Sequence, residues 1–388
     1  MIDSRDNLVQ AIPGRWQQHA TRAFFFIGGF GTASWAPLVP LLKARLGIDN
    51  DMLGMLLLCI GVGSLITMPI TGGAVARFGC RRVLSVAAVV YAGMLLSLSR
   101  VDSFMLAVPA LLVFGAAMGV VDVTANIHAV IVEKASGRQL MSGMHALWSV
   151  GGFIGAGIFG IWMKLGFTVF MATVCAAGIM MVLMAFFSRH LLIDSGEKEE
   201  SSIFAVPRGI VVFIAVIAMI AFLIEGAIMD WSGVFLTTAH ALDISLAGTG
   251  FAVFSAAMLT MRLTGDWLVQ KFGSKPIIFG GCVLSVIGFL FVILAPWQLL
   301  LYAGFFLIGI GSANIVPVFF SLLGKQKVMP LNMAVSAVST MGYMGILMGP
   351  AIIGFIASRT SLYISFGLLA GLVVLQMGII SYVYKKIL

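Results

Sequence analysis

The sequence predicts an all-α membrane protein whose twelve transmembrane helices form two pseudo-symmetric bundles of six. The first observation behind this prediction is composition: 61% of the 388 residues are hydrophobic and only 10% are charged. A soluble domain averages about 25% charged residues, so this chain cannot cover a core with a hydrated surface of that kind. The second observation is an internal repeat at an offset of 194 residues, which is half the chain length. Two homologous membrane halves, with a site between them, account for both observations.

The repeat consists of five glycine pairs and one basic loop that occurs twice. The glycine pairs are Gly54 and Gly248, Gly115 and Gly309, Gly151 and Gly345, Gly155 and Gly349, and Gly160 and Gly354. In the loop, 77–79 returns as 271–273, and Arg81 returns as Lys275. Glycines in a membrane helix allow a second helix to approach closely. In the loop, Gly79 and Gly273 allow the chain to reverse sharply.

Twelve apolar stretches are long enough to cross about 30 Å of hydrocarbon as helices. Strands are not expected, because exposed strand edges cannot be hydrogen-bonded in lipid. In chain order the predicted helices cover 20–42, 50–76, 82–99, 104–131, 141–163, 166–187, 209–238, 245–269, 276–295, 298–323, 332–357 and 360–384.

Lysine and arginine side chains predict how these helices are oriented. Counted over tails and loops, one side of the membrane carries 17 of them and the other carries 5. Because cytoplasmic loops are enriched in Lys and Arg, both termini are expected in the cytoplasm, as in a multi-pass protein of the bacterial inner membrane. The net charge of +8 then reflects topology, and nucleic acid is not an expected partner.

Polar segments divide the chain into five parts. Residues 188–208 are charged and lie at the midpoint, so they are expected to form a cytoplasmic linker between bundles at 20–187 and 209–384. Residues 1–19 are polar and lack the apolar core of a signal peptide, which predicts a cytoplasmic tail. Residues 385–388 are expected to be the cytoplasmic C-terminus.

No cofactor or metal is expected. The four cysteines are scattered, without the spacing of a metal site or a disulfide framework. The sequence contains no nucleotide-binding P-loop, so ATP is not expected to drive the protein directly. The expected partners are a small-molecule solute, protons and the lipid bilayer, and the chain is expected to act as a monomer.

The basic loop resembles the hallmark of the major facilitator superfamily, a Gly-x-Leu-Ala-Asp-Arg-x-Gly-Arg-Arg loop between helices 2 and 3 that is often echoed between helices 8 and 9. Its two copies here run from 72 to 82 and from 266 to 275. Both copies keep the basic, aromatic and glycine residues, whereas the Asp of the family pattern is Ala76 and Gln270 here. The resemblance implies the major facilitator fold and a transporter, with the loop cations anchored at the inner leaflet.

Three further strings resemble the bacterial YbjJ/MosC-like group of this superfamily. They cover 122–126, 141–149 and 225–232. The substrates of that group are poorly defined, so this resemblance implies transport without naming a solute.

An ionisable side chain inside a bilayer costs at least about 2.5–3.5 kcal/mol, so each one is a candidate functional residue. Asp122 and Asn126 share one helix face, and His145 and Ser149 share a face of the next helix. Because a short loop joins these helices, the two pairs are expected at similar depth on antiparallel neighbours. A carboxyl group at low dielectric can exchange a proton near neutral pH, and a nearby imidazole can tune or accept it. The alternative is a structural hydrogen-bond cluster between the two helices.

Glu225 is the fifth candidate for proton coupling or solute contact, and Gly226 beside it is expected to mark a helix bend. The string around Glu225 is related to one in the first helix, where Trp35 corresponds to Trp231. The two helices are therefore interpreted as paired elements of an outer gate. Asp230 and Trp231 lie near the outer end, where a gate, a helix-end contact or an interfacial anchor is expected.

Several other residues are gating or structural candidates. Arg262 and Asp266 are one turn apart and are expected to pair on one helix face, with contact to an anionic solute as the alternative role of Arg262. Asn314 lies in a helix that a proline is expected to kink. Gly79 and Gly273 are assigned to the two tight loops.

The leading hypothesis is a secondary active transporter that moves a small polar solute, such as a sugar, polyol or organic metabolite, by alternating access coupled to protons. The runner-up is drug or metabolite efflux by proton antiport, which the 24 methionines would suit as adaptable apolar contacts. An integral-membrane enzyme is a remote alternative, because only His145 and Ser149 hint at a base and nucleophile and no third orienting group is evident. The chain is therefore expected not to be an enzyme.

Overall fold

The computed structural model of the chain describes residues 14–193, 204–243 and 246–387. Within these ranges the regular structure is helical, and no strand occurs. Eleven of the helical segments are long and apolar enough to cross a membrane by length and composition. The predicted eighth span, now α9, is not one of the eleven, because Arg262, Asp266 and Lys271 lower its hydropathy.

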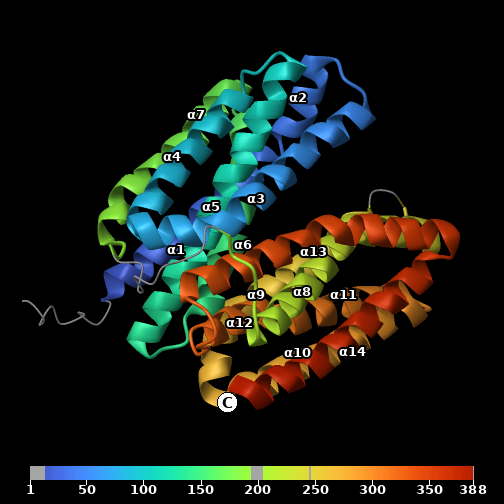
Figure 1. Ribbon diagram of the computed structural model, residues 1–388. Helices are drawn as coiled ribbons and strands as arrows, with labels where there is room; N and C mark the ends of the chain where they lie inside the picture. Colours follow the sequence, from blue (N-terminus) through green and yellow to red (C-terminus); the bar gives the residue numbers. More distant parts are fainter. Residues whose placement is uncertain (1–13, 194–203, 244–245, 388) are drawn as a thin grey trace, which may run out of the picture.

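The elements follow one another along the chain as two series of long helices (Figure 1). The first series is α1 (Arg15–Trp35), α2 (Leu38–Leu46), α3 (Asn50–Phe78), α4 (Cys80–Leu98), α5 (Phe104–Ser136), α6 (Met141–Lys164), α7 (Val169–Phe187) and the short η1 (Ser188–His190). The second series is α8 (Ile210–Val234), η2 (Phe235–Ala239), α9 (Thr249–Phe272), α10 (Ser274–Leu294), α11 (Gln298–Ser312), α12 (Ile315–Leu323), α13 (Leu331–Arg359) and α14 (Leu362–Ile387).

Two predicted spans are interrupted. The first is divided into α1 and α2 near Pro37, which has no amide hydrogen to continue the helix. The tenth is divided into α11 and α12 at Asn314. At the chain ends, α1 begins at Arg15, inside the predicted tail, and α14 continues to Ile387. Most of the predicted tail and the middle of the linker, 194–203, lie outside the described residues.

The basic loops are single-residue turns. Gly79 joins α3 to α4 with φ 80°, and Gly273 joins α9 to α10 with φ 84°. Both angles lie in the region that only glycine adopts without strain. The repeat therefore preserves a backbone geometry, and each pair of helices reverses direction at one residue.

The repeat also preserves helix contacts. A Cβ atom on Gly115 would meet the carbonyl oxygen of Ile60, and one on Gly309 would meet that of Phe254. Ile60 and Phe254 are themselves separated by the same 194-residue offset. Close approach of α3 to α5 in one half is thus repeated by α9 and α11 in the other, which explains why glycine recurs there.

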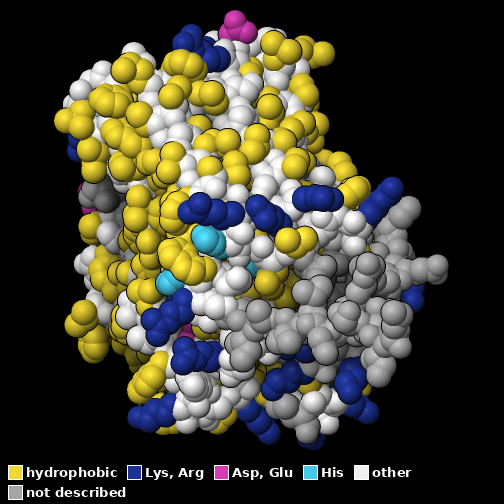
Figure 2. All heavy atoms as spheres, turned by 90° about the vertical axis from the view of Figure 1, so that its left-hand side faces the viewer, with side chains coloured by type: hydrophobic (Ala, Val, Ile, Leu, Met, Phe, Trp, Pro, Cys, Tyr) yellow, Lys and Arg dark blue, Asp and Glu magenta, His cyan; other side chains and the backbone are white. Residues whose placement is uncertain are grey.

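The two series of helices form two bundles that meet at one end and diverge toward α2 and η2 (Figure 1). The bundles meet through α3 against α13 and through α6 against α9. The end at which they meet carries the exposed cations Arg77, Lys134, Lys271 and Lys385, and we call it the basic end. Figure 2 shows Lys and Arg side chains spread over the face seen from that side, among few acidic ones.

Candidate functional site

Arg262 is the centre of a buried polar cluster that joins the two bundles. Its side chain is 6% exposed on α9, and its Nη2 lies 3.7 Å from Oε2 of Glu225 on α8. Nη1 donates a hydrogen bond to Oγ of Ser149 on α6 at 3.2 Å, and Nε donates to the carbonyl oxygen of Ala313 at 3.3 Å. Ala313 lies in the interruption between α11 and α12, so the broken helix supplies one of the acceptors that the buried guanidinium needs.

The predicted pairing of Arg262 with Asp266 is wrong. The guanidinium pairs with Glu225 of the preceding helix, while Asp266 turns to the other bundle. Oδ1 of Asp266 accepts a hydrogen bond from the amide of Ser142, and Oδ2 accepts one from that of Gly143, both at 2.9 Å. These amides lie in the first turn of α6 and have no partner within that helix, so the carboxylate of Asp266 supplies the acceptors that they need.

Two carboxylates thus cap the N-terminus of α6. Glu133 of α5 accepts hydrogen bonds from the amides of Leu140 and Met141 at 2.7 and 2.9 Å, within its own bundle. Asp266, which belongs to the second bundle, accepts hydrogen bonds from the next two amides of α6, those of Ser142 and Gly143. The Oγ of Ser142 also donates to Oδ1 of Asn314 at 2.9 Å. Asp266 and Asn314 therefore hold the bundles together at the basic end, and we call their contacts with α6 the α6 clasp.

His145 lies one helical turn from Ser149 on α6 and interacts electrostatically with Arg262. Its ring is 5.1 Å from that of Phe25 and 5.9 Å from that of Phe320, which belongs to the other bundle. Its Nε2 is buried without a hydrogen-bond partner among the described residues. A buried polar atom of this kind is costly unless another group pairs with it. The interface therefore offers an unused donor or acceptor next to the cation.

Asp122 and Asn126 form a second polar cluster on α5. Nδ2 of Asn126 donates to the carbonyl oxygen of Asp122 at 3.0 Å and to its Oδ1 at 3.2 Å. From the other bundle, Tyr343 of α13 lies within electrostatic reach of the Asp122 carboxyl. The Tyr343 hydroxyl also contacts the sulfur of Met118 at 3.7 Å. Oδ1 of Asn126 has no partner among the described residues.

α5 and α6 are in contact, but less closely than expected for antiparallel neighbours. Their connecting loop is short, but α1 packs extensively against α6 and also contacts α5. Gly28 and Gly29 of α1 lie against Trp148 of α6, and their Cβ atoms would clash with it. Among the described residues, no hydrogen bond joins Asp122 or Asn126 to His145 or Ser149, and each pair interacts with the second bundle.

The proposed outer-gate residues lie within their own bundles. Trp35 packs against Phe114 with ring centroids 5.8 Å apart, and Nε1 of Trp231 donates to the carbonyl oxygen of Pro350 at 3.0 Å. Asp230 is exposed near the diverging ends. The bend expected at Gly226 stays a prediction: α8 continues as one helix through this residue, and Gly226 allows close packing against Ile346 of α13.

Sequence reasoning missed Ser142, Gly143 and Tyr343 as interface residues. Tyr343 is the one polar aromatic residue in the glycine-rich run 342–350, and that contrast was a usable signal. The roles of Ser142 and Gly143 depend on backbone amides, which residue type does not reveal. Within the described residues, no group of three or more His, Cys, Asp or Glu converges to hold a metal.

The chain is similar over most of its length to known proteins, in sequence and in fold. Residues 23–326 and 208–386 match the family model described as Major Facilitator Superfamily. The chain is 47% identical over 358 residues to an uncharacterized MFS-type transporter of Yersinia pestis, covering 92% of this chain and 93% of that protein. It is 29% identical over 356 residues to the membrane protein MosC of Rhizobium meliloti, covering 91% and 87%. The crystal structure of FucP in the outward conformation has a TM-score of 0.77 at 13% identity, covering 94% and 98%.

Proposed function

The chain belongs to the major facilitator superfamily and is a multi-pass membrane transporter, not an enzyme, and we propose that it moves a small polar solute by alternating access coupled to protons. The observation that carries the proposal is the Glu225–Arg262 ion pair, which is hydrogen-bonded to Ser149 across the bundle interface. FucP is named a fucose:proton symporter, but at 12% identity it supports the fold alone. The coupling proposal therefore depends on the buried charges of this chain.

Arg262 is the proposed solute contact. Its guanidinium is held by Glu225 and by two neutral acceptors, so it can exchange one of them for a hydroxyl, carbonyl or carboxylate oxygen of a solute. Protonation of Glu225 would remove the compensating charge and free Arg262 for that exchange. Glu225 is 29% exposed, so a proton can reach it while Arg262 stays buried. Solute and proton would then bind in a linked way.

Asp122 is the proposed second proton site. Its carboxyl group interacts electrostatically with Tyr343 of the other bundle, and movement of the bundles would change that interaction. A carboxyl group whose polar partner changes between two conformations also changes its proton affinity between them. Protonation can therefore bias the conformational equilibrium, which is the physical requirement for coupling.

The remaining parts of the proposal concern placement in the membrane. We assign the basic end to the cytoplasm, with both termini there, because cytoplasmic loops are enriched in Lys and Arg. We assign the bundles to 20–187 and 209–384, with 188–208 as their linker and short tails at 1–19 and 385–388. The protein is proposed to act as a monomer in a bacterial inner membrane.

Reconstituted protein tests the proposal directly. A panel of sugars, polyols and organic acids is first screened for thermal stabilisation of the purified protein, and the best ligand is then supplied to proteoliposomes under an imposed pH gradient. Asp122→Asn and Glu225→Gln should each reduce gradient-driven accumulation at least tenfold while leaving counterflow measurable. Asp102→Asn is the matched control, because Asp102 is an exposed acid at the diverging end.

Two outcomes would count against the proposal. Accumulation that is unchanged in both variants removes Asp122 and Glu225 from coupling. Counterflow of lipophilic cations without counterflow of polar solutes would favour the runner-up hypothesis, efflux by proton antiport.

A further inference from the structure

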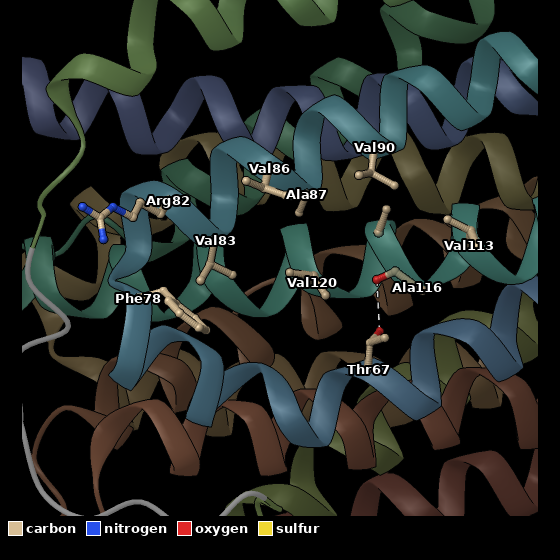
Figure 3. A pocket seen from close by; sticks show the side chains of 11 residues that line it. Thr67, Phe78, Arg82, Val83, Val86, Ala87, Val90, Val113, Ala116 and Val120 are labelled. Carbon is tan, nitrogen blue, oxygen red and sulfur yellow. Dashed lines mark hydrogen bonds between the residues drawn. The ribbon is translucent and has the colours of Figure 1, made fainter.

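A lateral groove lies on the first bundle, away from the interface between the bundles. It has a volume of about 490 Å³ and opens between α3 and α4, with α5 as its floor. The two walls are joined at the Gly79 turn, so the end of the groove lined by Phe78 and Arg82 lies at the basic end. Figure 3 shows the valines of α4 and α5 and the ring of Phe78 around it.

The groove is apolar except at its basic end. Of its lining side chains, Thr67 and Arg82 are the polar ones, and none is acidic. The Thr67 hydroxyl donates to the carbonyl oxygen of Ala116 at 3.0 Å, so it does not offer a free donor to a ligand (Figure 3). Val86 is 64% exposed and Phe78 50% exposed. The surface thus suits a hydrocarbon chain that lies lengthwise.

The cations at the basic end of the groove favour a ligand with an anionic headgroup. Arg82, in the first turn of α4, is exposed and forms no ion pair with the described residues. Arg77, in the last turn of α3, is also exposed. A guanidinium at a membrane surface attracts anionic headgroups and can bind a phosphate through two parallel hydrogen bonds. The charge here is positive and uncompensated by any acidic lining residue.

The dimensions match one membrane leaflet. From Arg82 to Val90 the groove follows eight residues of α4, which is about 12 Å at roughly 1.5 Å per residue. One leaflet contributes about 15 Å of hydrocarbon. A lipid with its headgroup at Arg82 would therefore place one acyl chain along the whole groove.

We propose that this groove binds an anionic phospholipid of the leaflet that Arg82 faces, with its phosphate at Arg82 and one acyl chain between α3 and α4. The inference requires that the chain spans a membrane and does not depend on the solute or on proton coupling. Because α3 also packs against α13 of the other bundle, a lipid wedged beside α3 lies next to an element that must move during transport.

Two pairs of variants separate the headgroup and acyl contacts. Arg82→Gln removes the proposed phosphate contact, and Arg81→Gln removes an adjacent cation that does not line the groove. Val86→Phe fills the groove, and Val89→Phe places the same ring on an exposed position of α4 outside it. Native mass spectrometry of the full chain, titrated with phosphatidylglycerol or phosphatidylcholine of identical acyl chains, measures the bound lipid.

The wild-type chain should bind phosphatidylglycerol at least about fivefold more tightly than phosphatidylcholine, and Arg82→Gln should abolish that preference. Val86→Phe should weaken binding of both lipids, whereas Arg81→Gln and Val89→Phe should each stay within twofold of wild type. Equal affinity of the wild type for the two lipids would overturn the proposal, as would equal effects of Arg82→Gln and Arg81→Gln. A dimer that Val86→Phe dissociates would overturn it in favour of a second copy of this chain.

Discussion

The α6 clasp makes a quantitative prediction about the conformational equilibrium. Asp266 accepts two amide hydrogen bonds from the other bundle at 2.9 Å. A hydrogen bond to a charged group contributes about 1.5–3 kcal/mol when buried, and partial hydration of Asp266 reduces this to roughly 1–2 kcal/mol each. Asp266→Ala should therefore destabilise the arrangement in which the bundles meet at the basic end by about 2–4 kcal/mol, which changes the population ratio by roughly 30- to 1,000-fold.

The change can be measured with spin labels across the basic end. Lys134 and Lys271 are exposed there on α5 and α9, so cysteines at these positions report the separation of the bundles. Cys59 and Cys175 are partly exposed and must first be replaced by serine, while Cys80 and Cys282 are buried. If the wild type is joined in about 99% of molecules, the variant should be separated in about a quarter to nine-tenths of them.

Two further variants test whether the change in bundle separation comes from the hydrogen bonds of Asp266. Asp266→Asn keeps one acceptor without the charge and should lie between wild type and Asp266→Ala. Asp230→Ala removes an exposed acid at the diverging end and should leave the distance distribution unchanged. The reasoning is refuted if Asp266→Ala gives the wild-type distribution, because the capping bonds would then contribute nothing to keeping the bundles together.

Two further predictions concern stability. Glu225→Gln leaves Arg262 buried without a countercharge and should lower the unfolding free energy in detergent by about 1–3 kcal/mol, less than for a fully buried pair because Glu225 is 29% exposed. The double variant with Arg262→Gln should recover part of that loss, and an additive loss would show that the pair is not coupled. Gly115→Ala and Gly309→Ala should each cost about 1–3 kcal/mol by thermal unfolding, because each Cβ would meet a carbonyl oxygen of a neighbouring helix. Gly93→Ala, which has open space around its Cβ, is the control, and a similar loss in all three would contradict the close-approach argument.

The sequence predicted most of the helical framework because its signals are local or recur at one offset. Long apolar runs define the helices through the cost of unpaired backbone groups in lipid. The recurrence of Gly79 and Gly273, and of Gly115 and Gly309, predicted two related halves, and the structure places the members of each pair in equivalent turns and contacts.

Which side chains pair between different helices could not be predicted from the sequence, and only the tertiary structure decided it. Spacing along α9 favoured a pair between Arg262 and Asp266, but Arg262 binds Glu225 and Ser149, and Asp266 caps α6. The short connection between α5 and α6 suggested close contact, but α6 packs mainly against α1 and only slightly against α5. Spacing states which side chains share a face of one helix. Which groups that face meets depends on the rotation and packing of every neighbouring helix, and on backbone amides that the residue type does not show.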